Sequence, residues 1–259
     1  MEKTPEHNER IVDQFSKLAA HFAQLPGDPE ATQWLVQFAA IASTDVILDV
    51  ACGAGTVACA AARVARQVTG IDLTAAMIEQ AERLQTQLGL SNLSWHVGNV
   101  NPLPYVSDSF TVALTRYTFH HFLDPYAVLA EMVRVCEPGG RVLVADLVLP
   151  PAKIEAYDRM ERMRDPSHVR VLTESELLGM FTKAGLVDLQ QSWYLFELTL
   201  RQLLEASFAK PGDAERVHVI FEADVGVDNL GIGVHRKDGE IQFAYPISVV
   251  VGTKPSRVR

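Results

Sequence analysis

From about residue 43, the chain alternates short apolar runs with amphipathic stretches. The apolar runs have the length and the β-branched content of buried strands, and the amphipathic stretches have helical spacing. We predict strands at 46–50, 67–71, 93–97, 110–115 and 141–147, and helices at 56–64, 74–88 and 125–135. Alternating strands and helices form a parallel sheet with helices on both faces, and ligands bind at the carboxyl ends of the strands. The pattern therefore predicts an α/β, Rossmann-like fold.

The N-terminal segment predicts a helical lid ahead of this core. Four apolar residues follow the i, i+3, i+4, i+7 spacing of one helix face: Phe15, Leu18, Ala19 and Phe22. A break at 25–29 with two prolines and a glycine separates this helix from a second one near 31–42. We expect the first helix to cover the ligand site.

The C-terminal part changes character. Helices are predicted at 173–184, 198–208 and 213–223, and strand-like stretches at 187–196, 232–235 and 241–251. The last two stretches flank a Lys-Asp-Gly-Glu turn and predict a hairpin. The helices after Tyr194 predict a small cap inserted between the last strands of a mostly parallel, seven-stranded sheet. We expect one domain over 1–259, with the lid at 1–42, the core at 43–190, and the cap and final strands at 191–259.

The strand at 46–50 leads into a turn of small residues. From Val46 to Thr56 the sequence is Val-Ile-Leu-Asp-Val-Ala-Cys-Gly-Ala-Gly-Thr. Gly53 and Gly55 let the backbone turn sharply and let a ligand approach closely. The helix that follows points its N-terminus at that ligand.

Asp49 indicates which ligand this turn binds. A dinucleotide-binding fingerprint also has two early glycines and an acid about 20 residues later, and Asp72 follows Gly55 by 72 − 55 = 17 residues. A carboxylate beside the glycine turn would repel a pyrophosphate but attract an ammonium group. S-adenosylmethionine (SAM) carries an ammonium group, a ribose diol and an adenine, and no phosphate. The pattern therefore favours SAM over a nicotinamide dinucleotide.

The ends of the next two strands offer groups for the rest of this ligand. Asp72 could accept hydrogen bonds from a ribose diol, or serve only as an acid at a helix N-terminus. Leu73 and Met77 offer apolar contacts to an adenine, or pack in the core. In the Gly98–Val100 segment, Asn99 could pair with the adenine amino group or belong to an ordinary turn.

The segment after the fourth strand holds candidates for acid–base chemistry. It contains Thr115, Arg116, Tyr117, Thr118, Phe119, His120, His121 and Phe122, and we expect the first two beside the cofactor. Either histidine could act as a general base or bind the acceptor, because imidazole titrates near neutral pH, and Tyr117 is a further candidate for both roles. The simpler alternative is that one histidine packs and the other is solvated. Without a third ligand nearby, we expect no metal.

A polar loop after the fifth strand could orient the acceptor. The loop at 164–170 carries Arg164, His168 and Arg170, which offer hydrogen bonds to a polar substrate. His168 is also a candidate for the base, and Arg170 could bind a carboxylate. The alternative is a solvated loop in which an arginine pairs with an acid of the next helix.

Composition narrows the class of partner. The 259 residues carry a net charge of −9 and an isoelectric point of about 5.4, so we expect no binding to nucleic acid. The polar N-terminus and the lack of an apolar run of ~18 residues predict neither a signal peptide nor a membrane span, and we expect a cytoplasmic protein. Three cysteines without C-x-x-C spacing predict neither a disulfide framework nor a zinc site.

Four blocks of sequence, in order, resemble class I SAM-dependent methyltransferases. The blocks are 48–56, 70–73 with Met77, 103–110 ahead of 119–122, and 131–140. One glycine motif alone would be a weak signal, but four blocks in family order are specific. The resemblance covers about residues 10–190 and is to the ubiquinone/menaquinone-biosynthesis branch, the type 11 methyltransferases.

The resemblance implies roles for the residues of the glycine turn. Asp49, with the backbone around Ala51, Gly53 and Gly55, would bind the methionine end of SAM, and Asp72 would bind the ribose. The cofactor is shared across the family far better than the acceptor, so the acceptor does not follow from the resemblance.

Two positions depart from the family pattern. Asn99 stands where an acid is usual, which weakens the expected contact with adenine. Phe22 stands where a tyrosine is frequent, which removes a hydroxyl from the lid; Phe22 remains a candidate for the acceptor site.

The leading hypothesis is methyl transfer from SAM to an O, N or C nucleophile of a small organic acceptor, with S-adenosylhomocysteine (SAH) as product. Three alternatives stay open: a SAM-binding cyclase or decarboxylase, an NAD(P)-dependent oxidoreductase, and a scaffold with a vestigial cofactor site. Apolar cap residues are compatible with a hydrophobic or aromatic acceptor, although core packing explains them equally well: Phe196, Leu203, Leu204 and Phe208. A homodimer stays open as the oligomeric state of this chain.

Overall fold

The computed structural model describes residues 4–19, 21, 28–208 and 210–256. Its centre is one sheet with strand order β3-β2-β1-β4-β5-β8-β6, and the short strand β7 pairs with β8 beside this path. The strands are β1 (Val46–Val50), β2 (Gln67–Asp72), β3 (Leu93–Val97), β4 (Phe110–Arg116), β5 (Cys136–Leu147), β6 (Val187–Thr199), β7 (His235–Lys237) and β8 (Glu240–Thr253). The first five are parallel, and β8 is antiparallel to β5 and β6. The predicted α/β fold is confirmed, with β7 as an eighth strand.

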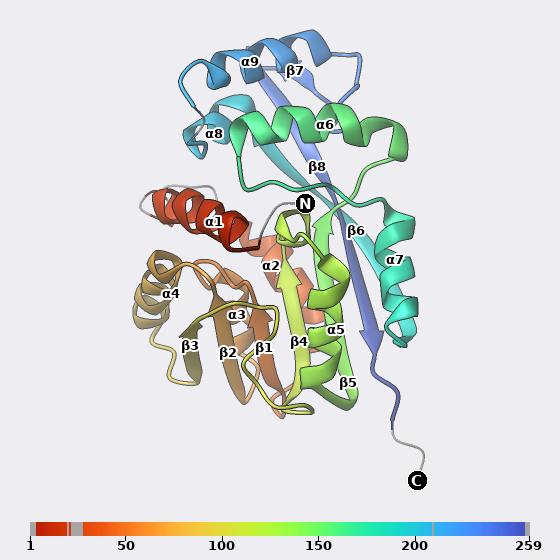
Figure 1. Ribbon diagram of the computed structural model, residues 1–259. Coiled ribbons are helices and arrows are strands. Elements are labelled where there is room, and N and C mark those ends of the chain that lie inside the picture. The colour runs from red at the N-terminus through yellow and green to blue at the C-terminus, as the bar shows by residue number, and fades with distance from the viewer. Residues whose placement is uncertain (1–3, 20, 22–27, 209, 257–259) are drawn as a thin grey trace.

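Helices cover both faces of this sheet (Figure 1). They are α1 (Thr4–Ala19), α2 (Pro29–Phe38), α3 (Thr56–Ala62), α4 (Ala75–Leu88), α5 (Pro125–Val135), α6 (Pro151–Arg164), α7 (Glu174–Lys183), α8 (Leu200–Glu205) and α9 (Asp213–Asp224), with a 3-10 turn, η2 (Phe119–His121). On one face Leu35 of α2 and Ala58 of α3 are buried, and on the other Leu129 of α5 and Phe181 of α7. Apolar runs such as that of β1 are continuous because helices bury both faces. Within the described ranges, no helix has the length and apolar character needed to cross a bilayer.

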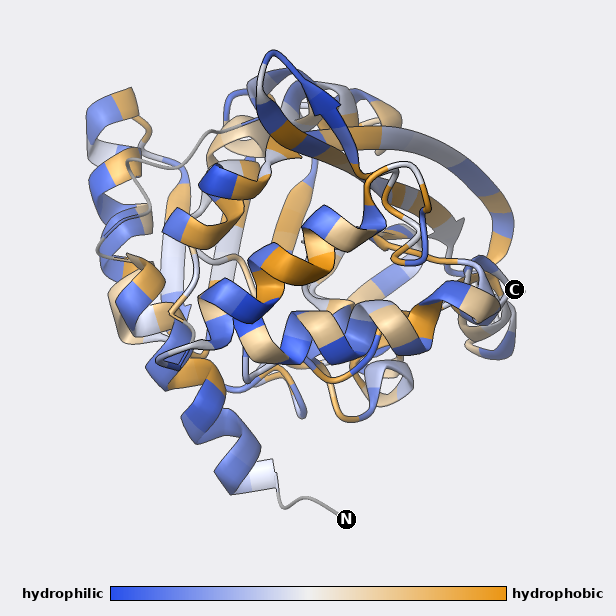
Figure 2. Cartoon of the chain, turned by 90° about the horizontal axis from the view of Figure 1, so that it is seen from above, coloured by the Kyte–Doolittle hydropathy of each residue, from blue (hydrophilic) through white to orange (hydrophobic). Residues whose placement is uncertain are grey.

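The N-terminal helix lies above the carboxyl ends of the parallel strands (Figure 1). Phe15 and Leu18 of α1 pack against Ala54, in the turn after β1, and Met77, in α4. Figure 2, which views the molecule from above, shows hydrophilic and hydrophobic residues interleaved along the upper helices, as expected for helices buried on one side. The helix predicted around Phe15 therefore does cover this end of the sheet.

The cap is formed by the segment between the two antiparallel strands β6 and β8. Both strands extend beyond the core sheet, and α8, α9 and β7 lie at their far end (Figure 1). Phe221 of α9 meets Phe243 of β8 with ring centroids 5.1 Å apart. The insertion predicted after Tyr194 is therefore present, although α8 starts later than the predicted helix because β6 continues to Thr199, and it ends earlier, at Glu205.

Two other parts of the predicted pattern were wrong. The strand predicted at 141–147 begins earlier: residues 137–140 also belong to β5, and Gly139 there has φ +84° and donates its N–H to the Lys254 carbonyl. The strand predicted at 232–235 is instead β7, which begins at His235. Gly139 is held by Lys254, which is distant in the sequence, so local spacing does not record this contact. β7 pairs with the adjacent start of β8, from His235 with Gln242 to Lys237 with Glu240, so the predicted hairpin is present but its first strand begins later.

A helix that the sequence did not predict, α6, follows β5. Its apolar pattern is weak because charged residues are buried on it, among them Asp158 and Glu161. Such side chains hide the usual difference between an apolar and a polar helix face. The loop predicted at 164–170 therefore begins at the end of this helix.

The turn after β1 gives a prediction about stability. Gly55 has φ +77°, and an added Cβ would lie 2.6 Å from Cη2 of Trp95 and 2.8 Å from Cβ of Ala81. Gly55→Ala should lower the free energy of unfolding by about 1–3 kcal/mol more than Gly89→Ala does, since overpacking adds to backbone strain. Gly89 is the matched control, because it has φ +64° but nothing within 4 Å. Urea unfolding of both variants measures the difference, and equal losses would contradict the close packing at Gly55.

Candidate active site

A cavity of about 360 Å³ lies at the carboxyl ends of β1, β2 and β4, beneath α1. Its walls come from α1, the turn after β1, the ends of β2 and β3, and the segment after β4. The lining residues that the sequence predicted are Asp49, Ala51, Gly53, Asp72, Leu73, Met77, Asn99, Val100, Arg116, Tyr117 and His121. Candidates from four separate segments of the sequence therefore share one cavity.

Other lining residues had not been singled out from the sequence as contacts of a ligand. They are Thr4, His7, Asn8, Ile11, Cys52, Ala54, Thr56, Val57, Asn101, Thr118, Phe122, Leu123, Asp124 and Val128. His7, Ile11, Phe15 and Leu18 follow one another at intervals of three or four on α1, which is a helical signal. The polar composition of residues 4–10 concealed that signal.

Asp72 connects the glycine turn with the start of α4. One of its carboxylate oxygens accepts the N–H of Gly53 at 2.8 Å, and the other accepts the N–H of Thr74 at 2.8 Å. Burial raises the pKa of Asp72 above its ordinary value, while these hydrogen bonds oppose the increase. Each oxygen keeps a further lone pair for a ligand. An added Cβ at Gly53 would meet no atom within 4 Å, so the turn is open around that residue.

Asp49 is a buried acid without a full set of partners. Only 2% of the residue is exposed, and its Oδ2 atom has no hydrogen-bond partner within the described chain. Burial raises the pKa of Asp49 to about 7, an increase that the charge of Arg116 opposes and that of Asp72 reinforces. Because an unpartnered buried carboxylate is costly, this group indicates a site for a hydrogen-bond donor, and a cation fits best.

Arg116 and Tyr117 form the wall at the end of β4. Arg116 donates hydrogen bonds to the hydroxyls of Thr32, at 2.8 Å, and Thr56, at 3.3 Å. Tyr117 has a positive φ of 60°, and its hydroxyl lies 2.7 Å from that of Tyr194. Burial raises the pKa of Tyr117, so its hydroxyl stays protonated at neutral pH.

The two adjacent histidines have different surroundings, as their neighbouring positions require. His120 places Nδ1 2.7 Å from Oδ1 of Asp146 and does not line the cavity. Burial alone would lower the pKa of His120, but the charge and hydrogen bond of Asp146 raise it. His121 does line the cavity, with its ring edge-to-face against Phe15 of the lid.

The remaining predicted site residues lie outside the cavity lining. They are Gly55, Gly98, Thr115, His120, Arg164, His168 and Arg170. Thr115 donates its hydroxyl hydrogen to the carbonyl of Val50, at 2.6 Å, and Gly98 donates its N–H to the carbonyl of Asp72. Phe22 lies outside the described residues.

The polar loop after α6 is held by side-chain contacts with α6 and α7. His168 places Nε2 2.8 Å from Oδ1 of Asp158, and both residues are buried. Arg164 pairs with Glu161 of α6. Arg170 pairs at the surface with Glu176 at 3.0 Å, which is the alternative that the sequence left open.

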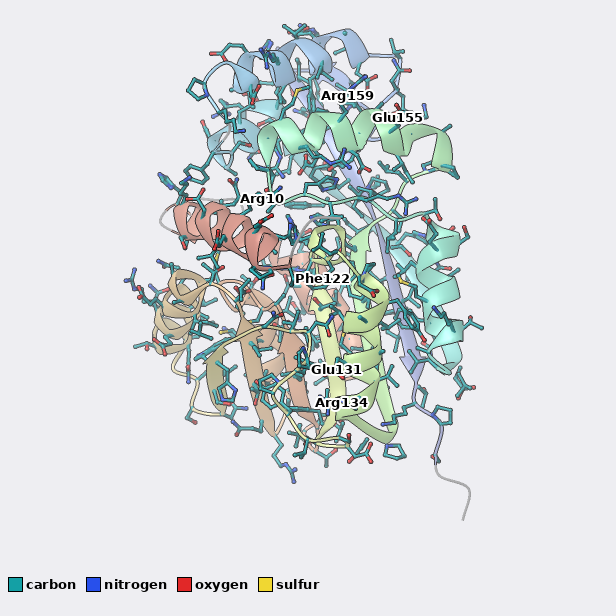
Figure 3. The ribbon with its side chains drawn as sticks, viewed as in Figure 1. Arg10, Phe122, Glu131, Arg134, Glu155 and Arg159 are labelled. Atoms are coloured by element: carbon teal, nitrogen blue, oxygen red, sulfur yellow. The ribbon has the colours of Figure 1, made fainter. Side chains whose placement is uncertain are left out.

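The loop that carries Asn99 toward the cavity is attached to α5. Glu131 accepts the N–H of Leu103, and Arg134, which pairs with Glu131, donates to the carbonyls of Leu103 and Tyr105 (Figure 3). The amide oxygen of Asn99 accepts the N–H of Asn101, which leaves its NH₂ group for a ligand.

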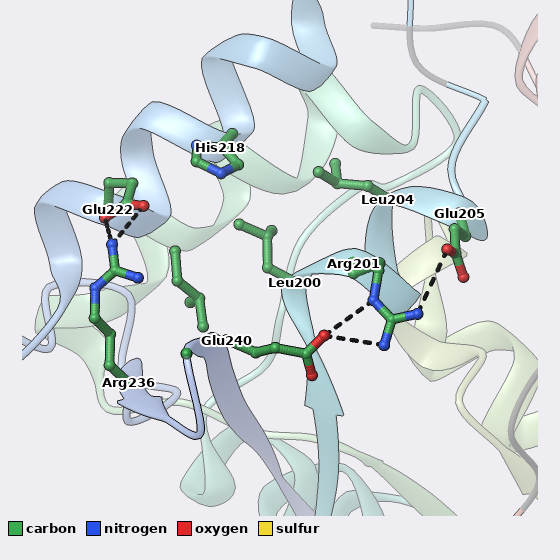
Figure 4. Close-up of a pocket in the computed structure, with 10 residues that line it drawn as sticks. Leu200, Arg201, Leu204, Glu205, His218, Glu222, Arg236 and Glu240 are labelled. Atoms are coloured by element: carbon green, nitrogen blue, oxygen red, sulfur yellow. Dashed lines mark hydrogen bonds and ion pairs between the residues drawn. The ribbon is translucent and has the colours of Figure 1, made fainter.

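A second pocket, of about 530 Å³, lies on the cap between α8, α9 and the β7–β8 hairpin (Figure 4). Its charged side chains pair with one another: Arg201 lies 2.9 Å from Glu240, and Arg236 lies 2.5 Å from Glu222. Leu204, one of the apolar cap residues considered for the acceptor, lines it, but none of the predicted cofactor-binding or catalytic residues does. The cavity under α1, where a buried acid lacks a partner, is therefore the candidate active site.

Comparison with known proteins agrees with this geometry. A family described as "Methyltransferase domain" matches residues 41–185. The uncharacterized methyltransferase YcgJ of Bacillus subtilis is 31% identical over 219 residues, which are 80% of this chain and 84% of that protein. The crystal structure of YcgJ has a TM-score of 0.79 at 24% identity and covers 88% of this chain and 99% of its own.

Two other similarities are weaker or shorter. The ubiquinone/menaquinone biosynthesis C-methyltransferase UbiE of Desulfotalea psychrophila is 35% identical over 113 residues, 43% of this chain and 44% of that protein. A phosphoethanolamine N-methyltransferase of Haemonchus contortus, solved with SAH, has a TM-score of 0.65 at 16% identity, over 90% of this chain and 54% of its own. The family match over residues 41–185 and the similarity to YcgJ over most of both chains show that this chain belongs to the methyltransferase family.

Proposed function

We propose that this chain transfers a methyl group from SAM to a small organic acceptor. The observation that carries the proposal is the buried Asp49 carboxylate, whose Oδ2 lacks a partner beside an open glycine turn. An ammonium group is the ligand chemistry that satisfies it best. Membership of the methyltransferase family favours SAM over a dinucleotide as the source of that ammonium group.

The residues of the cavity suit the other parts of SAM. Asp72 has lone pairs for a ribose diol in addition to its two backbone hydrogen bonds. Leu73, Met77 and Val100 offer an apolar surface to an adenine. Besides the hydrogen bond that its oxygen accepts from the N–H of Asn101, Asn99 offers an adenine its NH₂ group and the second lone pair of that oxygen.

The chain contributes position and water exclusion. When bound, SAM supplies an electrophilic methyl group on a sulfonium. Asp49 would hold the methionine end of the cofactor and Asp72 its ribose. Ile11, Phe15 and Leu18 of the lid close the cavity on one side. Alignment of this kind accounts for about 7–11 kcal/mol in favourable cases.

We further propose that lid, core and cap work as one domain. The lid packs against Ala54 and Met77 of the core, and the strands that carry the cap are hydrogen-bonded to β5 through β8.

The apolar lining supports a hydrophobic or aromatic acceptor. Incubation with methyl-labelled SAM and a small-molecule extract tests transfer: labelled product is expected, and SAM cleavage or rearrangement without a methylated product would favour a cyclase or decarboxylase instead.

The role of Asp49 gives a prediction about binding. Asp49→Asn should weaken SAH binding about tenfold to a hundredfold, because a hydrogen bond to a charged partner contributes about 1.5–3 kcal/mol. Isothermal titration calorimetry measures the change. Asp188→Asn, at an exposed acid on β6, is the control and should bind as the natural chain does. Equal affinities for all three proteins would rule out Asp49 as the ammonium site.

The raised pKa of Asp49 gives a prediction about pH. The acid is charged above pH 7 and protonated below it, since burial raises its pKa to about 7. SAH affinity should therefore be greatest near pH 8 and fall by up to about tenfold per pH unit between pH 7 and pH 5. Most of this dependence should disappear in Asp49→Asn, leaving only the share of Asp72. Calorimetry at several pH values decides, and a dependence of the same size in both proteins would contradict the assignment.

A further inference from the structure

His121 is the lining histidine, and its ring is connected to a buried acid through one hydroxyl. Its Nδ1 lies 3.1 Å from Oγ of Ser167, and this Oγ donates a hydrogen bond of 2.6 Å to Oδ1 of Asp165. All three residues are buried, with Ser167 fully so. The same Asp165 oxygen also accepts the N–H of Ser167 at 2.8 Å. The three side chains therefore form a chain that ends at the cavity.

The single hydrogen of the Ser167 hydroxyl fixes the tautomer of His121. Burial alone would raise the pKa of Asp165, but the charge of Arg164 and the hydrogen bonds of Ser167 lower it, so Asp165 is a carboxylate beside a neutral His121. A serine hydroxyl has one hydrogen, and the 2.6 Å contact with Asp165 requires it. Nδ1 of His121 must then donate to Ser167, and the lone pair of the neutral ring lies on Nε2.

Nε2 of His121 is the ring atom left for a ligand. It makes no hydrogen bond within the described chain. It is nevertheless absent from the set of fully buried polar atoms without a partner, so it is not fully buried. Since His121 lines the cavity, Nε2 is accessible there. Phe15 meets the ring edge-to-face at 5.2 Å, and His7 of α1 contacts the His121 carbonyl at 2.7 Å, so the lid fixes this segment from above.

Burial, with a smaller contribution from neighbouring histidines, keeps His121 neutral. Burial lowers the pKa of His121 to about 3, and the charges of His120 and His168 lower it further, against the opposing charge of Asp165. The groups that face the ring come from three elements: His120 on η2, Asp165 and His168 on the loop after α6, and His7 on α1. A neutral imidazole with a free lone pair is a hydrogen-bond acceptor throughout the physiological range.

We propose that Asp165 and Ser167 are positioning residues that orient His121 so that its Nε2 accepts the hydrogen of a phenol-type hydroxyl on the methyl acceptor. This inference rests on the proposed methyl transfer. A weakly basic imidazole takes a proton more readily from a phenol, with a pKa of about 10, than from an aliphatic alcohol. The apolar residues Ile11, Phe15 and Phe122 suit an aromatic ring in the same cavity.

The step balances in atoms and charge. The acceptor oxygen forms a bond to the methyl carbon as the bond from that carbon to sulfur breaks, and the sulfur keeps the electron pair. The hydroxyl hydrogen passes to Nε2 as a proton. The resulting imidazolium still donates from Nδ1 to Ser167, whose hydroxyl donates to Asp165, and it loses the proton to water when the product leaves.

The tautomer is measured directly by ¹⁵N NMR of histidine-labelled protein, with His121→Gln to assign the signal. We expect His121 in the natural chain to carry its proton on Nδ1 between pH 6 and pH 8. Ser167→Ala removes the acceptor of that proton, so the share of Nε2–H should rise. A proton on Nε2 in the natural chain would overturn the proposal. Because the deciding spectrum is that of the natural chain, the result holds even if Ser167→Ala does not fold.

The hydroxyl is tested with phenol and its methyl ether, anisole, added to the SAH-loaded protein. Phenol should shift the Nε2 signal of His121, and anisole, which has no hydrogen to donate, should not. Equal shifts, or no shift with phenol, would overturn the assignment of the acceptor hydroxyl. Calorimetry with SAH separates the proposed methyl transfer from the proposed orientation of His121. If the natural chain does not bind SAH, the methyl transfer is contradicted, whereas the tautomer measured in the ligand-free protein still stands.

Discussion

One buried carboxylate determines how this fold can work. Asp49 lies at the carboxyl end of the central parallel strands, almost without solvent contact, and one of its oxygens has no partner. The folded protein bears the cost of that unpartnered group, and a bound cation would remove the cost. The same carboxylate argues against a phosphate ligand beside the turn. The place where we propose that the ligand binds therefore lowers the stability of the ligand-free protein.

The rest of the cavity is arranged around this acid. Asp72 fixes the turn through the Gly53 and Thr74 amides, so the backbone is formed before a ligand arrives. Glu131 and Arg134 attach the loop after β3 to α5, and α1 closes the top. Preformed geometry reduces the ordering cost of binding. The acceptor side is fixed differently, through ionic and hydrogen-bonded side chains that surround η2.

The sequence predicted well which residues at the ends of β1 and β2 share a cavity, and poorly the network of side chains around η2. Strands and turns of the core are local patterns, so β1, β3 and α5 have the predicted bounds, and the residues around Asp49 and Asp72 share one cavity. Helix α6 escaped prediction because buried charges mask its period. The separation of His121 from His120 depends on Asp146 and Ser167, which are distant in sequence. Nothing in local spacing records such partners.

The central claim is that the Asp49 carboxylate binds a positively charged group of the ligand. The titration of this carboxyl tests the claim most directly. ¹³C NMR of the labelled Asp49 carboxyl should show a pKa near 7 in the ligand-free protein, because burial raises it. Saturating SAH should move that pKa well below its ligand-free value, since the ammonium group stabilises the charged form. An unchanged pKa with SAH bound would contradict the account.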